Sequence, residues 1–140
     1  MPQLPEVLTV IFKLDWTQLD NYNFEDLNRV ESNVQSIANL LEEMAYVPEL
    51  QAVKIDWDMK TLPTLTQINR VESNMDALRQ SFYAPAGWDN RKTWILDMKF
   101  NWEDALRFER NLDLLQQLIK LVKDSMKYSG TFNSGQEVIL

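Results

Sequence analysis

Apolar residues recur every three or four positions in three separate stretches of the chain. These stretches cover residues 24–44, 65–82 and 102–126, and each would place its apolar side chains on one side of a helix. A residue suited to N-capping precedes each stretch, and three positions later stands a side chain that can bond back to the cap. The pairs are Asn23 with Asp26, Thr64 with Gln67, and Asn101 with Asp104. The pattern therefore predicts three amphipathic helices with defined starts.

An extended segment precedes each predicted helix. Residues 8–16 are rich in apolar and β-branched residues, residues 51–57 alternate apolar and polar positions, and residues 92–98 show a shifted version of this pattern. The sequence leaves open whether the three segments pair as a small sheet or lie as separate extended arms. Residues 128–140 contain glycines and end in apolar residues, which favours a turn and a short edge strand.

The extended segment and its helix form a unit that occurs three times. Residues 13–16 read Lys-Leu-Asp-Trp, and residues 54–57 read Lys-Ile-Asp-Trp. At the same spacing, residues 28–33 and 69–74 share the sequence Asn-Arg-Val-Glu-Ser-Asn. A third, more divergent copy contains Trp94 and the sequence Arg-Phe-Glu-Arg-Asn at residues 107–111. Such self-similarity at a fixed period indicates duplication.

The fold class that these patterns predict is mainly α. One unit of this size cannot bury enough apolar surface to be stable alone, whereas three apolar stripes can cover one another. We therefore expect a single domain, 1–140, that is a three-helix bundle with short β or extended segments laid against it. The repeat units are 8–46, 50–83 and 91–127, and residues 128–140 form a C-terminal extended coda.

Composition excludes several classes of function. The 140 residues include no cysteine and no histidine, which removes disulfides, thiolate zinc sites, cysteine nucleophiles and the most common general base. A net charge of −7 argues against binding to nucleic acid or to an anionic membrane surface. The first residues lack the features of a signal peptide, and no apolar run is long enough to cross a bilayer. We expect no cofactor, no metal and no enzymatic activity.

The shared motif is Trp, twelve residues, Arg, an apolar residue, Glu, any residue and Asn. On a helical wheel its glutamate and asparagine lie at the boundary of the apolar stripe, where such groups usually bond a neighbouring backbone or arginine. We expect a structural role, with each copy clamping an adjoining arm or helix. The residues are Trp16, Arg29, Glu31 and Asn33; Trp57, Arg70, Glu72 and Asn74; and Trp94, Arg107, Glu109 and Asn111.

Two alternative interpretations of the motif stay open. Glu31, Glu72 and Glu109 would be the acid and base of a carboxylate enzyme, although glycosidase chemistry requires two unlike carboxylates rather than three similar ones. The repeated tryptophans, which we expect to pack the arms onto the helices, would otherwise stack on sugars. Outside the motif, residues 82–90 form a loop in which Tyr83 and Trp88 are candidate contacts for a partner or a glycan.

Residues 27–33, Leu-Asn-Arg-Val-Glu-Ser-Asn, follow a tryptophan-containing extended piece, and residues 128–135 read Tyr-Ser-Gly-Thr-Phe-Asn-Ser-Gly. Together they resemble small tail or baseplate structural proteins of phages and prophages of Gram-positive bacteria. The third copy departs from this pattern at Leu106 and Arg110. The resemblance implies a virion assembly protein, made in the host cytoplasm, with no catalytic residues. It would act by contact with other virion proteins and form homo-oligomers; the alternative is a cell-wall carbohydrate-binding module.

Overall fold

Three α-helices form the part of the protein that the structure describes. The computed structural model describes residues 10–60 and 63–129, and side chains up to residue 126. The helices are α1 (Phe24–Glu43), α2 (Leu65–Ser81) and α3 (Trp102–Ser129), and the described residues contain no β-strand. The prediction of a mainly α three-helix bundle is therefore confirmed. α3 continues two residues into the predicted coda, so the expected end of this helix at residue 126 is wrong. The rest of the coda, 130–140, lies outside the described residues.

The helices begin where the capping residues predict. The side chain of Asn23 accepts hydrogen bonds from the first turn of α1, and Asp26 bonds back to the cap. Thr64 and Gln67 form the same reciprocal capping box at the start of α2. The backbone N–H of Asn101 likewise donates to the Asp104 carboxylate at 3.1 Å. Each cap satisfies N–H groups that would otherwise lack a partner, and this fixes the point where each helix starts.

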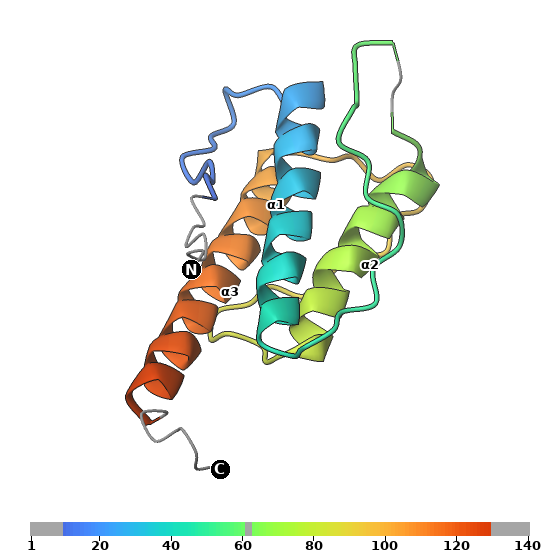
Figure 1. Ribbon diagram of the computed structural model, residues 1–140. Helices are drawn as coiled ribbons and strands as arrows, with labels where there is room; N and C mark the ends of the chain where they lie inside the picture. Colours follow the sequence, from blue (N-terminus) through green and yellow to red (C-terminus); the bar gives the residue numbers. More distant parts are fainter. Residues whose placement is uncertain (1–9, 61–62, 130–140) are drawn as a thin grey trace.

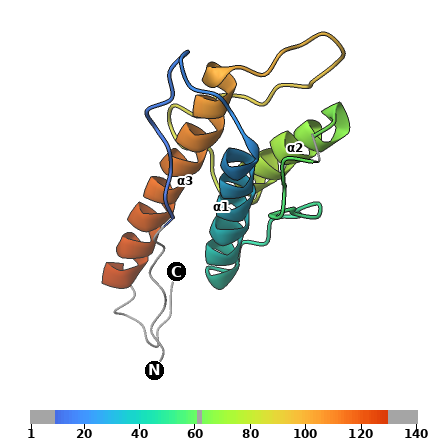
Figure 2. The same ribbon diagram turned by 90° about the horizontal axis from the view of Figure 1, so that it is seen from above.

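All three helices run in the same direction. Figure 1 shows their N-terminal ends together at the top, and Figure 2 shows α1 between α3 and α2. Consecutive parallel helices need a connection that returns along their whole length. Two of the extended segments make this return, one between α1 and α2 and the other between α2 and α3.

The apolar stripes of the three helices meet in the core. Val30, Leu78, Phe108 and Leu112 are fully buried there. Further buried positions follow the predicted helical spacing and are Val34, Ile37, Leu41, Val71, Met75, Leu115 and Ile119. Burial of these stripes is the main stabilising contribution to the bundle.

The extended segments do not pair with one another. They lie instead in the grooves between helices and bond to helix side chains, and they are named here arm 1 (10–16), arm 2 (51–57) and arm 3 (89–94). The predicted extension of the third segment to residue 98 is wrong. Arm 3 ends at Trp94, and a turn follows in which the N–H of Met98 donates to the carbonyl of Ile95 at 3.2 Å. Asp97 has a positive φ of 79° in this turn.

Candidate functional site: three grooves that hold the arms

The groove between α1 and α2 is organised around the carboxylate of Glu31. Arg70 of α2 donates to both of its oxygens, at 2.7 and 2.9 Å. Arm 2 contributes two more donors, the backbone N–H of Lys54 at 3.0 Å and the indole Nε1–H of Trp57 at 2.7 Å. Glu31 is only 2% exposed. One buried carboxylate therefore joins two helices and an arm, and its charge is balanced by a bidentate arginine.

Two asparagines hold the backbone of arm 2 at its ends. Asn28 of α1 accepts from the N–H of Trp57 at 2.8 Å and donates to the carbonyl of the same residue at 3.0 Å. Asn74 of α2 makes the same pair of bonds with Gln51, at 2.8 and 3.1 Å. An amide is suited to this task because it offers one donor and one acceptor side by side.

The groove between α2 and α3 repeats this arrangement. Glu72 accepts from Arg107 at 2.7 and 2.5 Å, from the indole of Trp94 at 2.8 Å, and from the backbone N–H of Lys92 at 3.3 Å. Asn69 bonds both backbone groups of Trp94, at 2.7 and 3.0 Å. At the other end of arm 3, Asn111 bonds both backbone groups of Asp89, at 2.9 and 2.8 Å.

The groove between α3 and α1 closes the circle with arm 1. Glu109 of α3 accepts from the backbone N–H of Lys13 at 3.0 Å and from Arg29 of α1, through Nε at 3.0 Å and through Nη2. Asn33 donates to the carbonyl of Ile11 at 2.9 Å. Each glutamate thus accepts hydrogen bonds from the arm and the arginine of the next unit. The glutamate of the third unit accepts them from the first unit. The result is a cyclic arrangement with approximate three-fold symmetry.

The α3–α1 groove lacks two features of the other grooves. Leu106 stands where Asn28 and Asn69 stand in the first two units, so no amide is available for the backbone of Trp16. The indole Nε1 of Trp16 is buried and has no hydrogen-bond partner among the described residues, whereas the other two motif indoles donate to glutamates. Trp16 itself is 4% exposed, so its ring is packed although its polar atom is not satisfied.

Two arginines of the network, Arg29 and Arg107, have raised pKa values. Burial lowers the pKa of Arg29, but its hydrogen bond with Glu109 and the negative charge there outweigh burial, and the pKa is raised overall. The pKa of Arg107 is raised in the same way, against burial, by its hydrogen bond with Glu72 and the charge of that carboxylate. Arg29 and Arg107 therefore stay charged in their ion pairs with Glu109 and Glu72.

A lysine covers the outer face of each motif tryptophan. Its ammonium lies within cation–π range of the indole, which keeps the charge in solvent while its stem covers the ring. The ammonium-to-ring distances are 4.8 Å for Lys13 over Trp16, 5.0 Å for Lys54 over Trp57, and 5.5 Å for Lys92 over Trp94. The tryptophans are thus covered from both sides and offer no open stacking face.

Sequence comparison of the three units missed parts of this network. An ungapped alignment on the tryptophans pairs Lys54 with Arg91, but the structure gives the role of Lys54 to Lys92, because arm 3 is one residue shorter between its lysine and its tryptophan. Asp89 was placed in a loop outside the repeat, yet its backbone is the anchor for Asn111. The shared asparagine at positions 28 and 69 was visible in the sequence but carried no assigned role.

The loop that contains Tyr83 and Trp88 leads into arm 3. Trp88 is half-buried against the core, whereas the Tyr83 side chain is 56% exposed. The Tyr83 ring lies 4.9 Å from that of Phe82 and 6.2 Å from that of Tyr46, in edge-to-face arrangements. Gly87 has a φ of 89°, which a residue with a side chain adopts only with strain. The exposed aromatic surface of this loop is therefore that of Tyr83.

Each arm ends in a turn that exposes a large apolar residue. These residues are Leu19, 85% exposed, Met59, 80% exposed, and Leu96, 77% exposed. We call them the tip residues. All three follow a motif tryptophan and precede the start of a helix, so they lie at the N-terminal end of the bundle. In Figure 2 the connections that carry them project at separate places around the helices.

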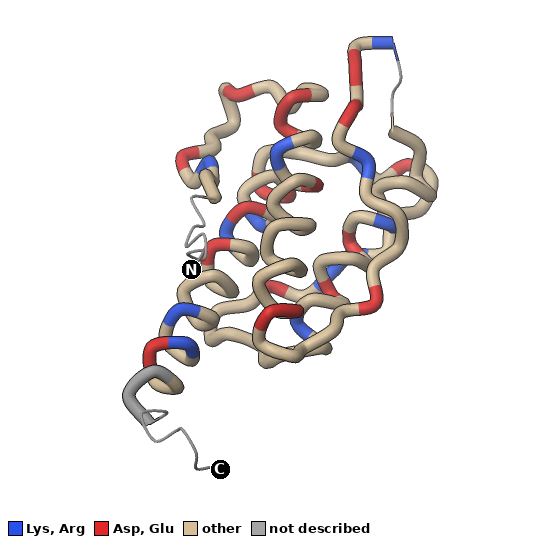
Figure 3. The backbone as a smooth tube through the Cα atoms, viewed as in Figure 1, with Lys and Arg blue, Asp and Glu red and all other residues tan. Residues whose placement is uncertain are grey.

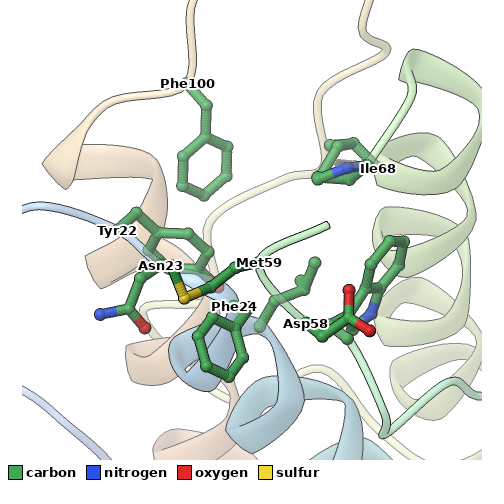
Figure 4. A pocket seen from close by; sticks show the side chains of 10 residues that line it. Tyr22, Asn23, Phe24, Asp58, Met59, Ile68 and Phe100 are labelled. Carbon is green, nitrogen blue, oxygen red and sulfur yellow. The ribbon is translucent and has the colours of Figure 1, made fainter. Parts of the chain in front are cut away.

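The same end of the bundle contains a cavity and is acidic. The cavity has a volume of about 550 Å³, and Figure 4 shows the mainly apolar side chains around it, among them Tyr22, Phe24, Met59 and Phe100. The Tyr22 hydroxyl oxygen is buried without a hydrogen-bond partner among the described residues, and burial raises its pKa well above the ordinary value. Figure 3 marks acidic positions in red along the backbone of the turns and of the first helical turns. The exposed ones are Asp15, Asp20, Glu25, Asp56, Asp58, Asp97 and Glu103.

Comparison with family models, curated proteins and solved structures gave no match. In the part of the chain that the structure describes, no helix is long and apolar enough to span a membrane. The same residues contain no group of three or more acidic side chains placed to hold a metal ion. The site is therefore interpreted from its own geometry.

Proposed function

We propose that this chain is a structural adaptor of a phage tail tip, baseplate or fibre and that it works through protein–protein contacts. The motif side chains support this proposal because they are engaged within the molecule. Glu31, Glu72 and Glu109 each lie in a different groove, buried and bound to an arginine. Acid–base catalysis of glycoside hydrolysis needs two carboxylates that face one substrate, and these three glutamates do not face one another.

The observation that carries the proposal is the set of three tip residues. Exposed leucine or methionine at three equivalent turns leaves apolar surface that a partner can bury. The turns are related by approximate three-fold symmetry, although Leu19 lies three residues after its tryptophan and Met59 and Leu96 lie two residues after theirs. A partner with three-fold symmetry can contact all three turns. Asp15 and Asp56 at this end pair with Lys13 and Lys54, and the remaining exposed carboxylates favour a partner with basic residues on the matching face. A phage tail is built from symmetric rings and fibres, and the resemblance of the motif to tail and baseplate proteins supports the same setting.

The experiment compares two triple variants in co-expression with the tail proteins of the same phage. Leu19→Ser, Met59→Ser and Leu96→Ser remove the tip residues. The matched control changes Val47, Leu121 and Met126 to serine, which are also exposed and apolar but lie toward the opposite end of the bundle.

Wild type and control should bind a tail protein, as measured by size-exclusion chromatography with light scattering. The tip variant should lose at least about a hundredfold in affinity, since burial of each such side chain contributes roughly 1.5–3 kcal/mol. Circular dichroism should show all three proteins equally helical. Undiminished binding by the tip variant, or no binding of folded wild type to any tail protein, would contradict the proposal.

Carbohydrate binding is the second candidate, and the exposure of Tyr83 favours it. Tyrosine on a loop is a common contact for sugars, and here its ring is held by Phe82 and Tyr46. Titration with cell-wall glycans, followed by tryptophan fluorescence of the neighbouring Trp88, tests this function. A saturable change that Tyr83→Ala abolishes would support it.

A further inference from the structure

We propose that the α3–α1 groove is an exchangeable binding site and that arm 1 of a second copy of this chain can occupy it. This inference does not depend on the phage assignment. It rests on the different ways in which the three otherwise equivalent grooves hold their arms.

The grooves accept an extended segment mainly through its backbone. In the α1–α2 groove, the segment supplies backbone groups at Gln51, Lys54 and Trp57, and a tryptophan ring that is buried between helices. Side chains of the helices provide every partner of these groups. Recognition of this kind needs an extended backbone and one well-placed tryptophan, and any chain that supplies both can bind, whether or not it is continuous with the helices.

Arm 1 is held by fewer bonds than the other arms. Among the described residues, arm 1 bonds to the helices through its Lys13 N–H and its Ile11 carbonyl. Arms 2 and 3 make both of these types of bond and add two bonds from Asn28 or Asn69 to the tryptophan backbone, as well as one from the indole. The buried Nε1 of Trp16, which has no partner in residues 10–60 and 63–126, adds a desolvation cost in the α3–α1 groove.

Arm 1 also differs in how the chain enters it. Arms 2 and 3 each connect two helices of the bundle, so neither can leave its groove without moving a helix. Within the described residues, arm 1 is followed by α1 and follows no helix, and residues 17–22 connect it to α1. Under this proposal, a change of backbone conformation within residues 17–22 carries arm 1 out of its own groove.

The occupant we infer is a second copy because its arm 1 has the required sequence. The exchanged arm would make the same contacts with Glu109 and Asn33, so exchange leaves the bonded energy unchanged. The chain's own arm 1 competes with the arm of the second copy for the groove. Its short connection to α1 gives it an effective concentration of roughly millimolar, which opposes exchange. Exchange is therefore expected where copies are packed closely, and reciprocal exchange closes a dimer.

Cross-linking between single-cysteine variants tests the proposal, because the natural chain has no cysteine. One protein carries Ile11→Cys and another carries Asn33→Cys, positions that are in contact in the α3–α1 groove. They are mixed at high concentration, either folded or refolded together, and treated with a short bismaleimide. The matched control pair is Gln51→Cys with Asn74→Cys, which are in contact in the α1–α2 groove.

A heterodimer should form at least tenfold more with the arm 1 pair than with the arm 2 pair, and its yield should increase with concentration. Leu106→Asn added to both proteins should slow its formation by about tenfold or more, because it supplies two hydrogen bonds to the Trp16 backbone. A single chain with Ile11→Cys and Asn33→Cys must cross-link internally, which establishes the reach of the reagent. If that chain reacts while the mixed pair gives no heterodimer, or gives no more than the control pair, the proposal is wrong.

Discussion

Replacing Glu72 by glutamine tests whether the buried carboxylates hold the bundle together. The substitution keeps the size of the side chain and removes its charge. In the structure Glu72 accepts two bonds from Arg107, one from the Trp94 indole and one from the Lys92 backbone. Glutamine has one acceptor oxygen where glutamate has two. Its NH₂ group would face N–H donors of the groove, with which it cannot form hydrogen bonds as an acceptor. The guanidinium of Arg107, whose side chain is 9% exposed, would lose its bidentate counter-charge and keep only Asp104, at 3.5 Å, as an acidic partner.

The expected loss is about 3–5 kcal/mol, the usual cost of removing one partner from a buried ion pair. For a domain of this length, that loss lowers the melting temperature by roughly 10–15 °C. Glu109→Gln should cost less, because no indole donates to Glu109 and the Arg29 side chain beside it is 24% exposed. The predicted order of destabilisation is therefore Glu72 above Glu109.

Thermal unfolding followed by circular dichroism, together with urea titration, measures both variants. Glu42→Gln, at an exposed position on α1, is the control and should change stability by less than about 0.5 kcal/mol. Adding Arg107→Met to Glu72→Gln should recover part of the loss, because it removes a buried charge that has lost its bidentate partner. If Glu72→Gln melted within about 2 °C of wild type, the carboxylate would not be the structural centre that its contacts indicate.

Three further predictions concern the incomplete groove and the cavity. Trp57→Phe should destabilise the protein by about 1–2 kcal/mol more than Trp16→Phe, since only the Trp57 indole has a hydrogen bond to lose; urea titration measures the difference. Leu106→Asn should raise the melting temperature by a few degrees, through about 1–2 kcal/mol from two new bonds to the arm 1 backbone. Tyr22→Phe should not reduce stability at neutral pH and should flatten the fall in stability above pH 10, measured by urea titration across pH.

The sign of the Tyr22 effect follows from its raised pKa. The folded protein keeps the phenol protonated, while in the unfolded chain this group loses its proton above the ordinary tyrosine pKa of 10.0. The stabilisation is therefore complete below pH 10 and is lost as pH rises toward the pKa of the folded state. A Tyr22→Phe variant whose stability fell as steeply as wild type would contradict this explanation. For Leu106→Asn, a lowered melting temperature would show that the new amide is not in reach of arm 1.

Local signals in the sequence were sufficient to predict the helices. Asn23 and Thr64 fix the start of α1 and α2 through contacts within four residues, and the apolar spacing defines the face that each helix buries. The boundary position of Glu31 and Asn33 on the helical wheel was enough to predict contact with a neighbouring arm or helix. These features depend on short-range chemistry, so a single sequence contains them.

The cyclic exchange of partners could not be predicted in the same way. Each glutamate bonds the arm and arginine of another unit, and that choice depends on parallel packing, which the sequence pattern leaves open. The register of arm 3 depends on one missing residue before Trp94, and only the position of the Glu72 carboxylate shows that Lys92 fills the role. The effect of Leu106, which is the loss of an amide that could bond the Trp16 backbone, could not be predicted either. The two residues are 90 positions apart, and only the folded structure brings them together.

The contact between arm 1 and Glu109, which closes the cycle, can form only late in synthesis of the chain. The Lys13 N–H lies 96 residues ahead of its acceptor Glu109, and Arg29 lies 80 residues ahead, whereas Glu31 and Arg70 are 39 residues apart. At a translation rate of roughly 5–20 residues per second, the first segment waits several seconds or more on the ribosome for its carboxylate. During that interval Trp16 has no complete groove to bind. Neighbouring nascent chains on one polysome can therefore meet while arm 1 of each chain is still able to bind the α3–α1 groove of either chain.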